Sequence, residues 1–354
     1  MKQTIAFHSN QLSITGTEIA LFDYALYNEE ILNNNSLVFY NAHNKNNHPD
    51  AIAKFKNRFQ VVGYKHTADF DRLLIENKAT LLYAIKAGKN DGIIAKTVPT
   101  MVHAVFPTHP SQMHGASYAF ISEWLSKHCS NQKIPCVPHI VDLPHEAGDL
   151  RQALQIPVDA KVLGNYGGRH SFDVACAIQA MHKVLERSNN TYFIFLNIEP
   201  FTQHPRALFL PGTTDVAFKV RFINTCDAML HARLQGESFG LACAEFSIKN
   251  KPVLTYAHSK HTHHHDVLGD KGFFYTDANS LVQIIESLDP AALKTGHWDQ
   301  YSARYNKQIV MGLFDQHLIQ PALRNPRLTR PQINIGWKDQ LSYYKLKLKM
   351  RFVA

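Results

Sequence analysis

The chain has 354 residues, of which 45% are hydrophobic and 19% charged, a composition typical of a folded protein with one large or two ordinary domains. The formal net charge is +8, and most of this basic excess follows residue 323, so a nucleic-acid enzyme is not indicated. No apolar run approaches the roughly 20 residues that span a bilayer, and the first residues lack the apolar core of a signal peptide, so we expect a cytoplasmic protein.

Short apolar runs alternate with amphipathic segments along most of the chain. In the first half, strands are predicted at Thr4–Phe7, Leu37–Tyr40, Phe59–Val62, Thr80–Ile85, Thr100–Val102 and Tyr118–Ile121, and helices at Thr17–Glu30 and Ala68–Asn77. In the second half, strands are predicted at Lys161–Asn165, Tyr192–Asn197, Ala207–Leu210, Ala228–His231 and Pro252–Thr255, and helices at Phe172–Arg187, Thr214–Cys226, Gly240–Lys249 and Ser280–Leu288. This alternation predicts parallel sheets covered by helices on both faces.

A polar stretch, Val141–Leu154, separates the two series of elements. We therefore predict an α/β fold of two doubly wound, Rossmann-like domains that face each other across a cleft, with ligands beyond the carboxyl ends of the strands. The predicted limits are 1–145 for an N-terminal, acceptor-side domain, 146–297 for a ligand-binding domain, and 298–354 for a C-terminal segment with a basic tail.

The basic tail, "QLSYYKLKLKMRFVA", alternates apolar and basic residues with a period of two. This period predicts a strand-like segment and not a helix. Two interpretations stay open: a solvated tail or edge strand, and a peripheral contact with an anionic membrane surface, where each basic residue contributes about 1 kcal/mol.

Two glycine-containing loops follow predicted strands and let a ligand approach the backbone. Gly16 and Thr17 open a helix whose first amides favour anions, or else form an ordinary loop in which Thr17 caps the helix. Gly168 and Arg169 follow a buried strand in the second half, where the guanidinium could neutralise a diphosphate. The alternative for Arg169 is a solvated side chain beside a glycine turn.

Histidines offer two weaker signals. His103 ends a buried strand of the first half; it is either a satisfied structural residue or a functional group at the carboxyl edge of the sheet. The stretch "HSKHTHHHDV" has irregular spacing, so we favour a polar loop over a zinc or copper site and expect no metal.

The most informative stretch is "GESFGLACAE", which contains Glu237 and Glu245. Glu237 precedes a predicted helix and Glu245 lies inside it, so the two carboxylates are expected to reach different parts of one ligand. They do not resemble an acid/base pair across one bond. The amides of Phe239, Gly240 and Leu241 are expected to form a positive helix terminus beside Glu237, although a dipole-stabilised surface glutamate is the simpler alternative.

This stretch, together with "VPHIVDLP", "YAFISEWLS", "LQIPVDAKVLGNYGGR" and "LGDKGFFYTDANSLVQII", resembles the GT-B glycosyltransferases, specifically glycosyltransferase family 4 with its Glu-x7-Glu motif. The resemblance implies transfer of a sugar from a nucleotide sugar to an acceptor. We expect a UDP- or GDP-linked donor, and the basic C-terminal end fits a glycan or lipid-linked acceptor at a membrane face. The resemblance further implies retention of anomeric configuration and no metal or other cofactor, and the charge distribution argues against a nucleic-acid partner.

The resemblance also implies roles for single residues. Glu237 would contact the donor sugar near the reacting carbon, Glu245 would hold the ribose, Arg169 would neutralise the diphosphate, and His103 would act near the donor sugar and acceptor. The implied donor-binding set also includes Gly168, Ser238, Phe239, Gly240, Leu241, Gly16 and Thr17. The last segment is expected to hold a helix that returns to the N-terminal domain, with the basic tail at the inner face of a membrane.

The sequence departs from the family at two places. The family carries a lysine about five residues after the Gly-Arg turn, where this chain has Val174, and the linker reads "PHIVD" where the family has Asn-Gly. Arg221, Arg233 or a residue of the His261–His265 loop could replace the lysine. A catalytically silent nucleotide-sugar-binding protein is therefore the alternative function. A nicotinamide-dependent dehydrogenase is disfavoured because no Gly-x-Gly-x-x-Gly run follows the first strand.

Overall fold

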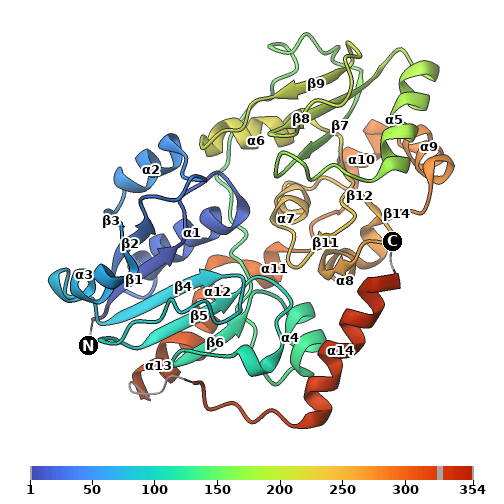
Figure 1. The fold of residues 1–354 in the computed structure, drawn as a ribbon. Helices are drawn as coiled ribbons and strands as arrows, with labels where there is room; N and C mark the ends of the chain where they lie inside the picture. Colours follow the sequence, from blue (N-terminus) through green and yellow to red (C-terminus); the bar gives the residue numbers. More distant parts are fainter. Residues whose placement is uncertain (1, 325–329, 353–354) are drawn as a thin grey trace. The chain divides into compact units, whose positions relative to one another are not determined.

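The computed structural model describes residues 2–324 and 330–352, and its secondary structure is shown in Figure 1. The chain forms two compact units. The first unit contains the chain up to Ile140 together with Tyr305–Phe352, and the second unit is Val141–Arg304. Sequence reasoning placed the corresponding boundaries after residues 145 and 297.

The first unit is built on a sheet of six parallel strands in the order β3-β2-β1-β4-β5-β6. The strands are β1 (Thr4–Ser9), β2 (Asn35–Asn41), β3 (Gln60–Tyr64), β4 (Leu81–Lys86), β5 (Thr100–Ala104) and β6 (Ser117–Phe120). Their near-continuous apolar sequence fits a sheet that is covered on both faces. The order reverses between β1 and β4, which makes the unit doubly wound.

The helices of the first unit come from both ends of the chain. They are α1 (Gly16–Glu30), α2 (Pro49–Lys56), α3 (Phe70–Glu76), α4 (Glu123–Ser130), α12 (Lys307–Phe314), α13 (Gln320–Arg324) and α14 (Trp337–Phe352), with a π-helical turn at Asp315–Ile319. The returning segment is part of the core, because Phe314 stacks on Phe7 and Tyr24, and Ser117 donates a hydrogen bond to the Leu318 carbonyl.

The second unit repeats the same topology in its own sheet, which has the order β14-β12-β10-β7-β8-β9. All its strand pairs are parallel. The strands are β7 (Lys161–Tyr166), β8 (Thr191–Leu196), β9 (Ala207–Leu210), β10 (Ala228–His231), β12 (Val253–Tyr256) and β14 (Phe273–Tyr275), and a separate short pair joins β11 (Gly236–Glu237) to β13 (His261–Thr262). Here the order reverses between β7 and β10.

The helices of the second unit are α5 (Ala175–Arg187), α6 (Val216–Thr225), α7 (Leu241–Ile248), α8 (His263–Leu268), α9 (Ala278–Ser287), α10 (Pro290–Thr295) and α11 (Ser302–Tyr305), the last of which ends in the first unit. The apolar faces of α5 and α9 bury Met181, Leu185, Leu281 and Ile285 against the sheet. The prediction of two doubly wound α/β domains is confirmed for each unit.

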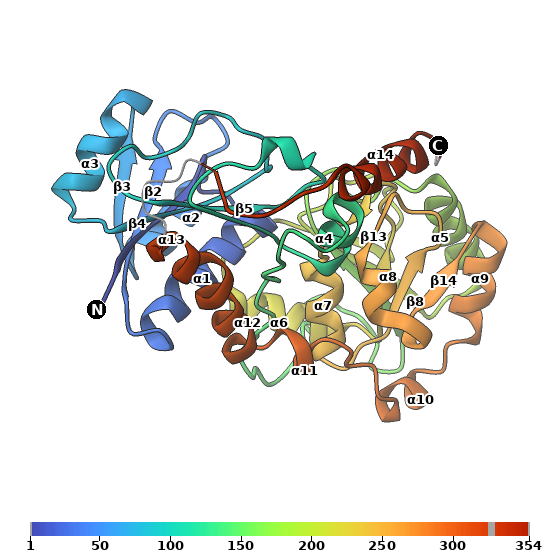
Figure 2. The ribbon, with the colours of Figure 1, turned by 90° about the horizontal axis from the view of Figure 1, so that it is seen from below.

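The strand-like tail predicted from the period of two is wrong, because Trp337–Phe352 forms the helix α14. Its Lys, Leu, Met and Arg residues are unbranched at Cβ and favour helix, and no Val, Ile or Thr in the segment favours strand. The helix lies along α4 (Figure 2). One face of α14 therefore packs against α4, and a pattern with a period of two does not reveal such a helical face.

Candidate functional site

The second unit has a natural ligand position where its strand order reverses, between β7 and β10. Gly168 and Arg169 follow β7, and Glu237 follows β10. The two loops are tied together by Asp173, whose carboxylate accepts a hydrogen bond of 2.7 Å from the amide of Leu234. The structure therefore brings these predicted site residues to one edge of one sheet.

Two glycines hold Glu237 in place. Gly236 has a φ of 64°, and a Cβ there would lie 2.0 Å from the His261 carbonyl oxygen. Gly240 has a φ of 94°, and a Cβ there would lie 3.1 Å from Cβ of Glu237. Both positions combine a left-handed backbone with a close approach, so side chains are disfavoured at each. The turn that presents Glu237 thus depends on glycine before and after it.

Glu237 is held by two neighbours from the end of β10. Its Oε1 accepts hydrogen bonds from Nη1 of Arg233 at 2.9 Å and from Nε2 of His231 at 3.3 Å. Burial acts to raise the pKa of Glu237, but the His231 hydrogen bond and the Arg233 charge outweigh it and lower that pKa to about 2. Glu237 is therefore a fixed anion and cannot serve as a proton donor near neutral pH.

A chain of hydrogen bonds extends from Glu237 into the core. A carboxylate only accepts, so Nε2 of His231 carries the proton, and Nδ1 of the same ring lies 2.8 Å from Oγ1 of Thr255. Thr255 also lies 3.0 Å from Nε2 of His264, a fully buried ring. Burial lowers the pKa of His264 well below its usual value, so this ring is neutral. The chain fixes the orientation of His231 and, through it, that of Glu237.

Glu245 lies in a separate buried network. Its Oε1 is 2.5 Å from the ammonium of Lys219, and its Oε2 accepts a hydrogen bond from the hydroxyl of Tyr166. Burial and the nearby Glu245 charge raise the pKa of Tyr166 well above its usual value, so the tyrosine donates. Because the two glutamates have different partners, they do not share a proton, in agreement with the expectation that they are not an acid/base pair.

After β7, the structure places the expected cation Arg169 at the surface, whereas the position of the family's lysine is occupied by the uncharged Val174. The Arg169 side chain is 69% exposed and pairs with Glu199, with Nη2 2.5 Å from Oε2. Gly168 beside it has open space where a Cβ would stand. Val174, which stands where the resemblance would place a lysine, is buried in the core of the second unit. Of the three substitutes considered, Arg233 is the one that pairs with Glu237.

The segment between the glutamates contributes backbone rather than side chains. The Phe239 ring is buried and stacks on His263 with ring centroids 5.3 Å apart. Gly240 is the N-cap of α7 and Leu241 is its first residue. Ser238 is partly exposed beside them. The amides of Phe239, Gly240 and Leu241 thus lie at the start of a helix, as expected.

The side chains of the histidine-rich loop have different partners, although the rings of His264 and His265 also contact each other, with centroids 4.3 Å apart. His261 contacts Gln235, His263 stacks on Phe239, His264 joins Thr255, and His265 contacts Phe274. Within residues 2–324 and 330–352, no three His, Cys, Asp or Glu side chains are arranged to hold a metal ion. The loop instead supports the Glu237 turn, because His264 belongs to its hydrogen-bond chain.

His103 lies in the first unit and is fully buried. Its Nδ1 is 2.8 Å from the hydroxyl of Tyr83, and its Nε2 is 2.7 Å from the carbonyl of Val137. Burial lowers its pKa to about 4, against the smaller effect of the backbone carbonyl. With both nitrogens bonded inside the protein, the structure favours the structural interpretation of His103, and its catalytic role stays a prediction.

The Gly16 loop also belongs to the first unit. Gly16 is the first residue of α1, and the N-cap is Thr15, so the prediction that Thr17 caps the helix is wrong. The reason is Glu18, whose buried carboxylate accepts hydrogen bonds from the hydroxyls of Ser9, Ser13 and Thr15. These bonds fix where the helix begins. A ligand-binding role for Gly16 and Thr17 stays a prediction.

Sequence reasoning missed a buried polar cluster where the strand order of the first unit reverses. The ammonium of Lys86, at the end of β4, is 2.6 Å from Asp91. His8 on β1 lies 2.9 Å from the hydroxyl of Tyr64, and burial, with the Lys86 charge, lowers the pKa of His8 to about 3. The sequence signal for this cluster is Lys86, a lysine at the end of an otherwise apolar strand. Lys219 in the apolar helix α6 gave the same kind of signal.

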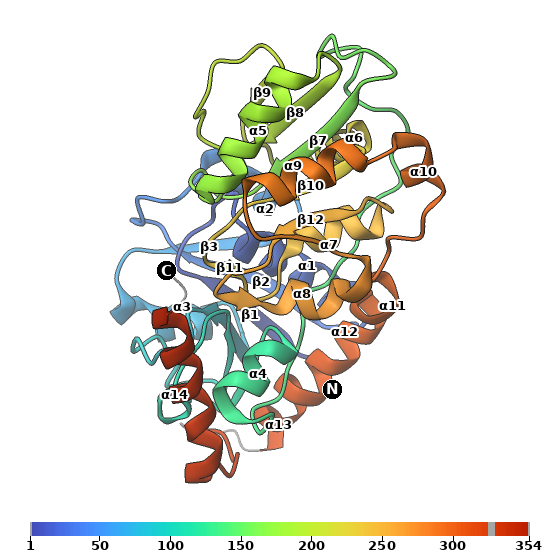
Figure 3. The same ribbon diagram turned by 90° about the vertical axis from the view of Figure 1, so that its right-hand side faces the viewer.

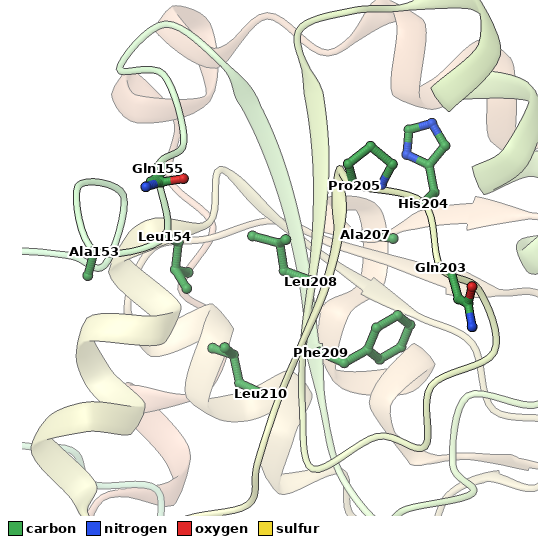
Figure 4. A pocket seen from close by; sticks show the side chains of 10 residues that line it. All are labelled: Ala153, Leu154, Gln155, Gln203, His204, Pro205, Ala207, Leu208, Phe209 and Leu210. Atoms are coloured by element: carbon green, nitrogen blue, oxygen red, sulfur yellow. The ribbon is translucent and has the colours of Figure 1, made fainter.

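A hollow of about 390 Å³ lies beside the edge strand β9, and Figure 4 shows the side chains around it. Its lining comes from the segments 153–155, 203–205 and 207–210. None of the predicted site residues is among them, so this hollow has no part in the site around Glu237.

Comparison with known proteins gives a result for structure only. No family model and no curated protein matches the sequence. Among solved structures, Anabaena HepE in complex with UDP-glucose has a TM-score of 0.70 at 15% identity, covering 89% of this chain and 99% of HepE. The lipopolysaccharide outer core galactosyltransferase WaaB has a TM-score of 0.55 at 13% identity, covering 90% of this chain and 99% of WaaB. A candidate UDP-N-acetylglucosamine 2-epimerase from Listeria monocytogenes has a TM-score of 0.56 at 10% identity, covering 90% and 96%.

These similarities agree with the topology of the two units. At such identities they establish the fold and leave the activity to be argued from the residues. The chain therefore has the two-domain, Rossmann-like fold of the GT-B glycosyltransferases.

Proposed function

We propose that the protein is a glycosyltransferase that moves a sugar from a nucleotide-sugar donor to a glycan or lipid-linked acceptor. The observation that supports this most strongly is the Glu237 turn. An anionic, ion-paired carboxylate and the N-terminus of α7 lie together at the reversal of strand order in the second unit. A nucleotide sugar has hydroxyls that a carboxylate accepts from and a diphosphate that amides and arginines bind.

The roles follow from the charges of the site. Glu237 stays ionised, so it would bind donor hydroxyls and stabilise the positive character that develops at the anomeric carbon. The amides of Phe239, Gly240 and Leu241, with Arg169 and Arg233, would stabilise the departing diphosphate, and Ser238 and Gly168 would line it. Glu245 would hold the ribose from its place beside Lys219. The sugar–phosphate bond breaks, the acceptor oxygen bonds the anomeric carbon, and the acceptor proton leaves with the diphosphate.

We further propose that transfer retains anomeric configuration, in keeping with the Glu-x7-Glu resemblance, and that it requires no metal. The HepE structure holds UDP-glucose, which supports a UDP-linked donor here. The activity named for WaaB, on the lipopolysaccharide outer core, supports an acceptor of the lipid-linked glycan class. Such an acceptor would place the protein at the inner face of a membrane. Among the described residues, no helix has both the length and the apolar content needed to cross a bilayer.

The burial of Val174 supports one alternative, a silent nucleotide-sugar-binding protein, because no lysine stands at the family position. The test is a thermal-shift screen of UDP-, GDP- and ADP-sugars, followed by measurement of nucleoside diphosphate release in chelator. Stabilisation together with release supports the transferase. Stabilisation without release, also in the presence of glycan acceptors, would favour the silent binder. Conversion of UDP-N-acetylglucosamine into its 2-epimer would instead assign the activity named for the Listeria protein.

A further inference from the structure

The helix α14 has two apolar faces, one of which is buried against the first unit while the other is mostly exposed. On the inner face Leu346 and Asp339 are buried, and Nδ2 of Asn131, at the end of α4, donates a hydrogen bond of 3.3 Å to Asp339. Tyr343 lies against His109, with ring centroids 5.2 Å apart. Figure 3 shows α14 beside α4. This face is sufficient to hold the helix on the first unit.

The outer face carries a row of large apolar side chains that are mostly exposed, although the Tyr344 ring also lies against His109 with centroids 5.2 Å apart. Trp337 is 69% exposed, Leu341 42%, Tyr344 57% and Leu348 57%. Their spacing of four, three and four residues places them on one side of a helix that turns about 100° per residue. Asp339, Tyr343 and Leu346 fall on the opposite side. We call these four exposed residues the outer stripe.

Basic residues border the outer stripe on both sides. At about 100° per residue, Lys338, Lys345 and Lys349 fall along one border, and Lys347 and Arg351 fall along the other. The only acidic residue of the helix, Asp339, is buried on the inner face. An approaching surface therefore meets apolar side chains that are flanked by positive charge alone.

We propose that the outer stripe and its basic borders bind the surface of an anionic phospholipid bilayer, with α14 lying in the plane of the interface. Trp, Tyr and Leu suit the boundary between headgroups and acyl chains, and long lysine side chains reach back to the phosphates. A second copy of this chain would set five basic residues against five others, so charge disfavours a dimer at this face. The proposal stands independently of the glycosyltransferase activity.

The experiment is co-sedimentation of the full chain with vesicles of phosphatidylcholine alone and of phosphatidylcholine with 30% phosphatidylglycerol. The expected result is binding to the anionic vesicles, weak binding to the neutral ones, and release by high salt. Leu341→Ser combined with Leu348→Ser should abolish binding. Lys345→Ala combined with Lys349→Ala should weaken it by about 30-fold, because each lysine near an anionic surface contributes about a fivefold factor.

The matched controls lie on other surfaces. Ile75→Ser removes an apolar side chain on α3 that is 61% exposed. Lys56→Ala combined with Lys65→Ala removes two exposed lysines. Neither control variant should change vesicle binding. Unfolding temperature and donor turnover should be unchanged in every variant, which separates this test from that of the activity. Equal binding of wild type and the Leu341/Leu348 variant would overturn the proposal. So would a monomer–dimer change in that variant without vesicle binding, which would assign the stripe to a second copy.

Discussion

His231 donates a hydrogen bond from Nε2 to Oε1 of Glu237, across 3.3 Å, from the last residue of β10. The other ring nitrogen is held by Thr255, which is held in turn by His264. This arrangement makes His231 a positioning residue for the carboxylate that we place beside the reacting sugar. It also explains how Glu237, at the end of the two-residue strand β11, is held in a single orientation.

His231→Leu should lower kcat about 10- to 100-fold and change KM little, because a hydrogen bond to a charged group contributes about 1.5–3 kcal/mol. His231→Gln keeps an N–H donor and should recover most of the loss. The measurement is steady-state nucleoside diphosphate release for both variants. Equal losses in the two variants, or a loss confined to KM, would contradict the positioning role.

Lys219→Met should destabilise the protein by about 3–5 kcal/mol, since it leaves the buried carboxylate of Glu245 without its cation. Adding Glu245→Leu should restore much of this loss, because no buried charge then remains. Urea unfolding measures both. The control is Arg187→Met, which breaks an exposed pair with Glu286 and should cost less than about 1 kcal/mol. No recovery in the double variant would show that Lys219 acts independently of Glu245.

Arg169→Met should weaken binding of UDP by about 10-fold, since one charge-assisted contact with the diphosphate is lost, about 1.5 kcal/mol. Arg169→Lys should recover part of the loss. Calorimetric titration with UDP and, separately, with uridine measures the effect, and uridine affinity should be unchanged. A similar loss for uridine would mean that Arg169 does not act on the diphosphate.

Folding stability should fall as the pH drops from 6.5 to about 4. His103 has a folded-state pKa of about 4 against 6.5 unfolded, so in this window the unfolded chain binds a proton that the folded chain does not. The expected loss from this residue is about 3 kcal/mol. Urea unfolding at pH 7, 5.5 and 4.5 measures it, and His103→Gln should reduce the slope. An unchanged slope would mean that His103 is not kept neutral by the fold.

The sequence predicted the strands better than the ends and the tail of the chain. Buried parallel strands are continuous apolar runs, so β1, β7 and β10 were visible without the structure. The helix α14 was predicted as a strand, because it has two apolar faces and its alternation imitates a period of two. The packing of this segment against α4 is what distinguishes the helix from the predicted strand.

The site was predicted in part for a similar physical reason. Glu237, Glu245 and the Gly168–Arg169 turn lie in short segments whose spacing can be read directly. Lys219 on α6 contacts Glu245, whereas Thr255 on β12 and His264 on α8 support Glu237 through His231, so these contacts depend on tertiary structure. The signal available in the sequence is a lysine or histidine within an apolar segment. Such a signal identifies the residue but does not show which side chain it contacts.

The role of Glu237 is tested by nucleoside diphosphate release from UDP-glucose, and from other donors that bind, by wild type and Glu237→Gln in the presence of chelator. The side chain of glutamine is similar in size but lacks the negative charge. We expect release by the wild type without metal, a loss of at least 100-fold in the variant, and unchanged UDP affinity. Wild-type turnover in Glu237→Gln would contradict the role of this carboxylate, and turnover that stops with chelator would contradict a metal-free reaction.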